Sequence, residues 1–208
     1  MKKQEQILYA YKEFCNAEGN QHIASEYAIL KLQKIIDSFA VRNVMEVGLG
    51  IGAIAGSLLS ANAGLEYSGA ENNDFCLNAL KKNLGENHGK LEVFSNLAEV
   101  PQRKFDLIII DGKDPDLERI QQLITGHGII AIEGDRMPQQ ELLRKYFPGH
   151  KYVHLISNKR NASYSPFPSG HWQGGLKIIL INPNFMQKCW WIKEKLNTKF
   201  KYFYRNKG

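Results

Sequence analysis

Apolar residues along the chain follow two different periods, which predict helices first and strands afterwards. In segments 2–17 and 24–39 they recur every three or four positions, the spacing of one helix face. Short apolar runs then alternate with amphipathic stretches. The runs predict strands at Asn43–Val47, Glu66–Glu71, Lys90–Ser95, Phe105–Ile110 and Gly128–Glu133. Helices are expected between these strands, near 51–61, 73–83 and 114–124 and after Pro138.

This alternation predicts right-handed βαβ units and a parallel sheet. Segment 107–110 is apolar on both faces, as expected for a central buried strand. Near the C-terminus, Lys151–Ser157 and Leu176–Asn182 have the pattern of strands, and no helical pattern separates them. They are therefore expected to pair antiparallel. The predicted fold is α/β: a Rossmann-like doubly wound sheet of five parallel strands plus a C-terminal antiparallel hairpin, with helices on both faces.

Charge divides the chain into a neutral body and a basic end. Segment 184–208 holds seven of the 27 Lys and Arg residues and one of the 21 acidic residues, which accounts for the net charge of +6. A neutral body argues against a nucleic-acid partner. We expect N-terminal helices at 1–40, a ligand-binding domain at 41–183, and a basic aromatic C-terminal helix or tail at 184–208. A chain of 208 residues suffices for one such α/β domain.

The sequence also bears on the compartment. No apolar run is long enough to span a bilayer, and no apolar stretch of the kind found in secretory signals follows the polar N-terminus. Cys15, Cys76 and Cys189 are far apart and indicate no disulfide framework. We therefore expect a cytoplasmic protein. The sequence does not define its oligomeric state.

Glycines and an acid mark a candidate ligand site. Gly48, Gly50 and Gly52 stand between a predicted strand and a predicted helix, where glycine lets the backbone turn tightly and approach a ligand closely. Glu71 ends the next strand, where a carboxylate can accept hydrogen bonds from a ribose diol. A tight turn between strand and helix, followed by a solvated acid at a strand end, would show the same residues without any ligand site. Nicotinamide enzymes use the same pair of features, so an NAD(P)-dependent Rossmann oxidoreductase stays open.

Five segments in this order resemble the class I S-adenosylmethionine-dependent methyltransferases. Segment 44–52 is similar to the first motif of the family, including an acid, Glu46, two residues before the first glycine. Segment 67–71 is similar to the second motif, and 94–98 occupies the place of the segment that flanks adenine. Segments 105–112 and 126–133 are similar to the fourth motif and the fifth strand. The resemblance implies methyl transfer from S-adenosylmethionine.

The resemblance also implies roles for individual residues. The cofactor-binding residues would be Glu46, Gly48, Gly50, Gly52, Glu71, Asn96 and Asp111. Asn96 departs from the family, which usually has an acid beside adenine. Glu46 fits the cofactor on charge as well. S-adenosylmethionine carries cationic sulfonium and amino groups and no phosphate, whereas a carboxylate at this place would repel a pyrophosphate.

Three roles are open for Asp111 at the end of the fourth strand. It could be a catalytic base, a metal ligand, or the cap of a helix that begins near Asp114. In cation-dependent O-methyltransferases the corresponding Asp binds Mg²⁺ together with an Asp-Asn pair after strand five. Here that place reads Glu133-Gly134-Asp135, without the Asn. Mg²⁺ is therefore the less favoured interpretation, and no metal ligand is assigned.

A hydroxyl of a small molecule or glycan is the expected acceptor, and it would need a base or a metal. The available groups are Asp111, Glu133 and His171. Asp111 and His171 are our catalytic candidates; His22 and His154 are weaker ones. His171 lies in an aromatic, Pro- and Gly-rich connection, 158–175, which could close over the acceptor or form a plain surface loop.

Two further alternatives concern the whole molecule. Aminopropyl transfer uses the same fold, and a non-catalytic cofactor-binding or peripheral protein would use the basic tail. A basic helix with aromatic residues can bind weakly to an anionic membrane surface. We expect Trp190 and Trp191 to pack on the domain and the chain to fray from Lys199 onward.

Overall fold

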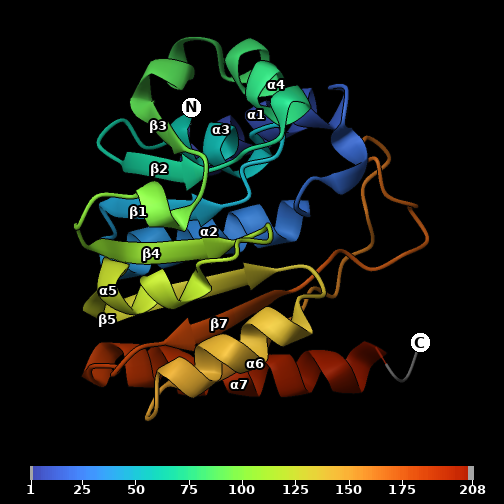
Figure 1. Ribbon diagram of the computed structural model, residues 1–208. Helices are drawn as coiled ribbons and strands as arrows, with labels where there is room; N and C mark the ends of the chain where they lie inside the picture. The colour runs from blue at the N-terminus through green and yellow to red at the C-terminus, as the bar shows by residue number, and fades with distance from the viewer. Residues whose placement is uncertain (1, 206–208) are drawn as a thin grey trace.

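A seven-stranded sheet organises the protein (Figure 1), which is described by a computed structural model over residues 2–205. The strand order is β3-β2-β1-β4-β5-β7-β6. The strands are β1 (Asn43–Val47), β2 (Glu66–Ala70), β3 (Leu91–Phe94), β4 (Phe105–Ile110), β5 (Ile124–Glu133), β6 (Lys151–Leu155) and β7 (Leu176–Leu180). The α-helices are α1 (Lys3–Cys15), α2 (Glu26–Phe39), α3 (Ala53–Leu59), α4 (Asp74–Leu84), α5 (Ile120–Leu123), α6 (Met137–Tyr146) and α7 (Phe185–Arg205). Short 3₁₀ helices are η1 (Asn20–His22), η2 (Gly85–Lys90), η3 (Leu97–Glu99) and η4 (Leu117–Arg119).

The strand directions confirm five parallel strands and a terminal hairpin. Strands β1 to β5 pair in parallel, whereas β7 runs antiparallel to both β5 and β6. The hairpin is inserted with its second strand against β5, so β6 forms the edge of the sheet and points the same way as β5. The long connection 156–175 gives the chain room to return between them.

Helices cover both faces of the sheet, as predicted. Helices α1, α2 and α3 pack on one face, where Leu107 and Ile109 of β4 point. Helices α5 and α6 cover the other face, where Ile108 and Ile110 point. Burial on both sides explains why β4 is apolar at every one of these positions. Among residues 2–205, no helix is both long enough and apolar enough to cross a bilayer.

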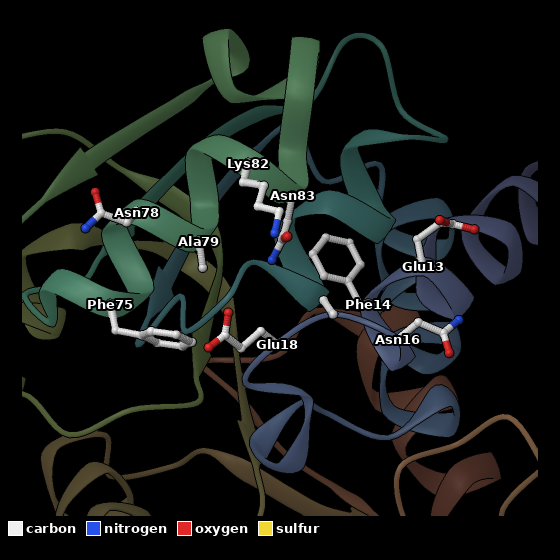
Figure 2. A pocket seen from close by; sticks show the side chains of 10 residues that line it. Glu13, Phe14, Asn16, Glu18, Phe75, Asn78, Ala79, Lys82 and Asn83 are labelled. Carbon is white, nitrogen blue, oxygen red and sulfur yellow. The ribbon is translucent and has the colours of Figure 1, made fainter.

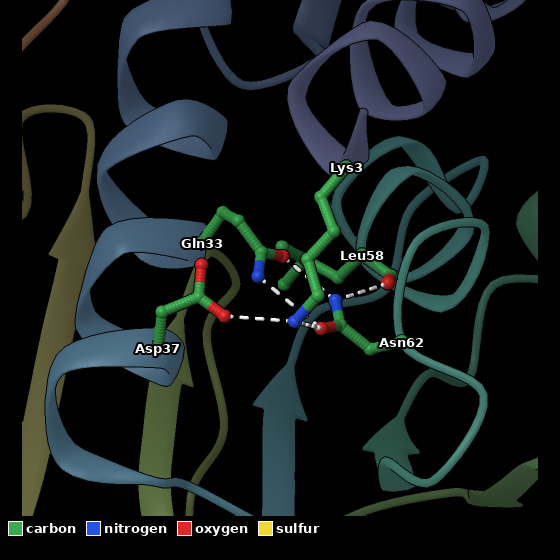
Figure 3. A network of polar contacts seen from close by, with 5 residues as sticks. All are labelled: Lys3, Gln33, Asp37, Leu58 and Asn62. Atoms are coloured by element: carbon green, nitrogen blue, oxygen red, sulfur yellow. Dashed lines mark hydrogen bonds and ion pairs between the residues drawn. The ribbon is translucent and has the colours of Figure 1, made fainter. Parts of the chain in front are cut away.

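A polar network fastens the N-terminal helix to the layer beneath it (Figure 3). The ammonium of Lys3 donates to Asp37 Oδ1 of α2 at 2.8 Å and to Asn62 Oδ1 after α3 at 3.0 Å. The side-chain amides of Gln33 and Asn62 exchange two hydrogen bonds of 3.2 and 2.7 Å. These contacts hold the start of α1 against the carboxyl ends of α2 and α3.

Two elements differ from the sequence prediction. The helix expected at 114–124 is reduced to η4 and α5, because β5 begins at Ile124, where it pairs with Phe105. The C-terminal helix continues to Arg205 instead of fraying at Lys199. Lys201 Nζ donates to the carbonyl of Ile156 at 2.9 Å, and Arg205 donates to that of Ser157. These bonds to the chain after β6 hold the last turns.

The structure confirms that the two tryptophans of α7 pack on the domain. The Trp190 ring meets Phe39 edge-on, with 5.6 Å between ring centroids. The indole nitrogen of Trp191 donates to the carbonyl of Tyr152 at 2.8 Å.

Candidate active site

Close contact between two loops builds the floor of the site. Gly48, Gly50 and Gly52 all have positive φ, at 86°, 53° and 91°, a conformation that favours glycine. A Cβ on Gly48 would lie 2.3 Å from Gly112 Cα, and one on Gly112 would lie 2.5 Å from Gly48 Cα. The loops after β1 and β4 can therefore meet only through these two glycines. That contact fixes Asp111 beside the glycine loop.

Glu71 braces the same loop from the end of β2. Its Oε2 accepts from the Gly50 amide at 2.8 Å, and its Oε1 accepts from the amides of Asn72 and Asn73 at 3.0 and 2.9 Å. An ionised carboxylate offers about four acceptor sites. One site therefore remains for a ligand hydroxyl.

Glu46 is a buried acid with one unpaired oxygen. Its side chain is 1% exposed, and Oε2 accepts from the Tyr67 hydroxyl at 2.5 Å. Oε1 has no hydrogen-bond partner among the described residues. Burial raises the pKa of Glu46 well above its usual range, the Tyr67 hydrogen bond opposes that rise, and the nearby Asp111 and Glu71 add to it. A buried carboxylate in this position is stabilised by a neighbouring cation.

A cavity of about 380 Å³ lies beside the glycine loop and Glu46. It has the size of a small-molecule site, roughly 300–1,000 Å³. Its wall is formed by segment 19–24 before α2, the glycine loop and the start of α4. Glu46 and Asp111 both line it. The cavity therefore lies at the carboxyl ends of the parallel strands, where ligands bind in open α/β sheets.

A carboxyl pair lies at the edge of this cavity. Because β4 and β5 are adjacent and parallel, Asp111 and Glu133 meet, and their side chains share a hydrogen bond. Arg136 Nη2 lies 3.1 Å from Asp111 Oδ1 and also donates to the Asp111 carbonyl. Burial raises the pKa of Asp111 to about 6, although Arg136 lowers it. Burial, followed by the charge of Asp111, raises the pKa of Glu133 to about 8.

These contacts bear on the three roles open for Asp111. Its side chain caps no helix: Asp114 Oδ2 and Oδ1 accept instead from the amides of Leu97 and Asp116. Arg136 already supplies a positive charge beside the Asp111 carboxylate. In residues 2–205 no group of three or more His, Cys, Asp or Glu side chains could hold a metal ion. The capping contacts therefore belong to Asp114, and the positive charge beside Asp111 comes from Arg136.

Five candidate residues do not line the cavity: Gly48, Gly52, Glu71, Asn96 and His171. Asn96 caps η3, with its Oδ1 accepting from the amides of Ala98 and Glu99 at 2.9 and 3.2 Å, so only its Nδ2 group remains to donate to a ligand. His171 is exposed and belongs to a loop that folds back on itself. Its backbone carbonyl accepts from Asn161, and Arg160 stacks on Trp172 at 3.8 Å. The loop therefore holds His171 at the surface.

His22 was underestimated from sequence, and two partners of the candidate acids were missed. His22 lines the cavity from η1, whereas His154 lies within β6. Tyr67 and Arg136 were missed, although both contact a candidate acid directly. Tyr67 is a polar aromatic residue in an otherwise buried strand, which was a usable signal.

Phe75 was also missed, and it stands between two cavities. A second cavity, of about 640 Å³, lies between the end of α1 and α4 (Figure 2). Phe14, Lys82 and Asn83 line it, but none of the loop glycines or strand-end acids does. Phe75 lines both cavities. The larger cavity is thus a neighbour of the candidate site and not the site itself.

The sheet, the glycine loop and the acids at the ends of β1, β2 and β4 define a class I S-adenosylmethionine-dependent methyltransferase, which confirms the resemblance. The model of the methyltransferase small domain matches residues 18–133, and the chain belongs to this family. The matched range includes every residue that lines the 380 Å³ cavity, and it ends at Glu133. No curated protein matches the sequence at a significant level.

Solved structures with the same fold include three methyltransferases of low sequence identity. An O-methyltransferase from Bacillus cereus in complex with SAH is 16% identical, with a TM-score of 0.59 over 86% of this chain and 90% of that chain. An S-adenosylmethionine-dependent O-methyltransferase from Thermotoga maritima is 12% identical, with a TM-score of 0.61 over 88% and 72%. Precorrin-6y C5,15-methyltransferase from Geobacter metallireducens is 13% identical, with a TM-score of 0.57 over 79% and 92%. At these identities the similarity establishes the fold alone.

Proposed function

We propose that this chain methylates a hydroxyl of a small molecule or glycan, with Asp111 as the base. The observation that carries the proposal is the buried, hydrogen-bonded pair of Asp111 and Glu133 at the edge of the cavity. A hydroxyl must lose its proton as it attacks, so its methylation needs a base, whereas an amine can attack through its lone pair. Two of the three structural neighbours named above are O-methyltransferases.

The residues present fit S-adenosylmethionine. Glu46 Oε1, buried and unpaired at the cavity wall, suits the cationic amino end of the molecule. Gly50 faces open space, since a Cβ there would meet no atom within 4 Å, and a ligand can approach its backbone closely. We assign Glu71 to the ribose diol, Phe75 to the adenine face, and the amide nitrogen of Asn96 to an adenine acceptor.

S-adenosylmethionine supplies an electrophilic methyl group on its sulfonium sulfur. The protein has two tasks beyond binding it: to align the acceptor oxygen with the methyl carbon, and to remove the acceptor proton. In our proposal the acceptor proton passes to Asp111 as the carbon–oxygen bond forms, and the electrons of the broken carbon–sulfur bond remain on sulfur. In our proposal Glu133, whose pKa is raised by burial and by Asp111, carries the proton of the pair and donates it to Asp111 in a hydrogen bond that holds the Asp111 carboxylate in place.

Two measurements test the proposal separately. Calorimetric titration with S-adenosylhomocysteine and with NADH should show binding of the first only; tight NADH binding alone would overturn the cofactor assignment. Methyl-labelled S-adenosylmethionine should then be incubated with panels of phenols, sugars and amines, and the products identified by NMR. Products methylated only on nitrogen would overturn the acceptor class and leave the cofactor assignment intact.

Replacing Glu71 with alanine should weaken cofactor binding by about one to two orders of magnitude. The variant loses a charged hydrogen-bond acceptor, worth roughly 1.5–3 kcal/mol per bond, and also the brace on Gly50. Isothermal titration of S-adenosylhomocysteine measures the loss. Glu66→Ala, an exposed acid at the other end of β2, is the control and should bind normally. Unchanged affinity in Glu71→Ala would remove Glu71 from the ribose site.

The rate of methyl transfer should fall as the pH drops through about 6, because Asp111 must be ionised to accept a proton. Arg136 lowers the pKa of Asp111. Arg136→Gln removes that charge, so the pKa of Asp111 should rise and the acid limb of the kcat profile should move to higher pH. Arg144→Gln, on the exposed side of α6, should leave the profile in place. If the acid limb of Arg136→Gln lies at the same pH as in the parent, ionisation of Asp111 does not determine that limb.

A further inference from the structure

Helix α7 turns several polar side chains toward the protein. Gln187, 3% exposed, donates to the His127 carbonyl at 2.7 Å, and Thr198 donates to the His154 carbonyl at 2.9 Å. Glu194, 8% exposed, pairs with Lys31 of α2 at 3.0 Å. A helix packed on a globular domain ordinarily places its apolar stripe inward and its polar face outward. Among the apolar residues of α7, only the two tryptophans follow that rule.

The outward side of α7 carries an apolar stripe instead. Large apolar side chains lie there at 80% exposure for Phe185, 52% for Ile192, 51% for Leu196 and 64% for Phe200. Cys189 between them is also exposed. Successive members are three or four residues apart, so they fall on one face along four turns of helix. In Figure 1 α7 forms the outer margin of the molecule, beyond α6 and β7.

Cations border this stripe, and no exposed acid accompanies them. Lys188, Lys195 and Lys199 lie along one side of it and Lys193 along the other, and all four are exposed. The one acid of the helix, Glu194, is buried against Lys31. The outward surface of α7 therefore combines apolar area with four positive charges.

We propose that α7 is an interfacial helix that lies in the plane of an anionic membrane surface. Its stripe would enter the boundary between head groups and acyl chains, and the flanking lysines would meet anionic head groups. Pairing with a second copy through the same face is disfavoured, because a two-fold interface would bring lysines of one copy against those of the other. The uncovered apolar area and the one-sided charge both match a negatively charged lipid surface.

The placement of α7 leaves the active site accessible on such a surface. Arg205, at the end of the helix, contacts Ser157 in the connection between β6 and β7, on the edge of the sheet where the parallel strands end. The helix runs alongside the strands in Figure 1. A membrane in contact with the stripe would thus lie parallel to the strands.

Vesicle co-sedimentation of the full chain tests the proposal. The protein should bind vesicles that contain phosphatidylglycerol and should not bind pure phosphatidylcholine. A variant with Lys188→Gln, Lys195→Gln and Lys199→Gln should bind roughly a hundredfold more weakly, at about fivefold per lysine. A variant with Ile192→Ser, Leu196→Ser and Phe200→Ser should also lose its binding to the anionic vesicles. Tyr9→Ser, an equally exposed aromatic residue on α1, is the matched control and should bind normally.

Every variant should bind S-adenosylhomocysteine like the parent, which shows that it is folded, because the changed side chains are exposed. Equal binding to neutral and anionic vesicles would overturn the role of the lysines. Failure of the parent to bind anionic vesicles would overturn the proposal as a whole. A parent that sediments as a dimer, and a serine variant that sediments as a monomer without vesicle binding by either, would show that a second copy covers the stripe.

Discussion

Replacing Gly48 with alanine is expected to abolish cofactor binding and to lower the free energy of unfolding by about 2–6 kcal/mol. The new Cβ would lie 2.3 Å from Gly112 Cα and 2.5 Å from Gly112 N, both backbone atoms that cannot turn aside. A non-glycine residue held at positive φ costs roughly 1–3 kcal/mol, and overpacking typically adds about 1–3 kcal/mol. Because relief requires the loops after β1 and β4 to separate, Glu46 and Asp111 would lose their common geometry.

Other glycines of the chain separate the steric effect from the conformational one. Gly149 has the same φ of 86°, but a Cβ there would meet nothing within 4 Å. Gly149→Ala should therefore cost only the conformational part, about 1–2 kcal/mol, and leave the cofactor site intact. Gly64→Ala, in open space at an ordinary φ, should change neither the free energy of unfolding nor cofactor binding. Thermal unfolding and titration of S-adenosylhomocysteine across the three variants measure both effects. Equal effects in Gly48→Ala and Gly149→Ala would mean that the contact with Gly112 is dispensable.

The sheet could be predicted because its strands are buried on both faces. A strand such as β4 has to be apolar at its fully buried positions 107–110, and this run of leucine and isoleucine predicts a central strand. The glycine loop was equally predictable from the sequence, because three positive φ angles within five residues require glycine. Local chemistry thus identified the loop and the strand ends that surround the cavity.

Contacts between segments that are distant in the chain could not be predicted from local sequence. The pairing of Arg136 with Asp111 depends on the turn after β5, where Gly134 takes a φ of 71°. The last turns of α7 persist because Lys201 and Arg205 reach carbonyls about 45 residues earlier. In both cases tertiary packing determines the partner, and the residues nearby in the sequence do not.

Asn96 is a different case, because its local role could have been foreseen. An Asn three residues before an acid is a recognised helix-start pattern, and here Asn96 caps η3 while Glu99 accepts from the Ser95 amide at 3.0 Å. The family resemblance directed attention to adenine and away from the backbone. The Asn96 oxygen serves the cap, and only the amide nitrogen is left for the ligand role proposed above.

The carboxyl pair leads to the largest expected effect on catalysis. Asp111→Asn should lower kcat by about 10²–10⁴-fold, the usual contribution of a general base. The amide keeps the size of the side chain, and its oxygen can still accept from Arg136, so the loop should hold its shape. Affinity for S-adenosylhomocysteine should stay within a few-fold of the parent, because Glu46 and Glu71 are untouched. The acid limb of the pH profile, which reports ionisation of Asp111, should disappear with the activity.

Glu133→Gln provides the comparison that assigns the proton to one member of the pair. Burial and the neighbouring Asp111 raise the pKa of Glu133 to about 8, which favours its protonated form, a hydrogen-bond donor, at neutral pH. A glutamine amide replaces that donor, and kcat should fall much less than in Asp111→Asn. Single-turnover rates of methyl transfer, measured at saturating cofactor and acceptor, compare the two variants directly. If Glu133→Gln were the more damaging change, Glu133 would be the base; if neither slowed the chemical step, the acceptor would need no base from this pair.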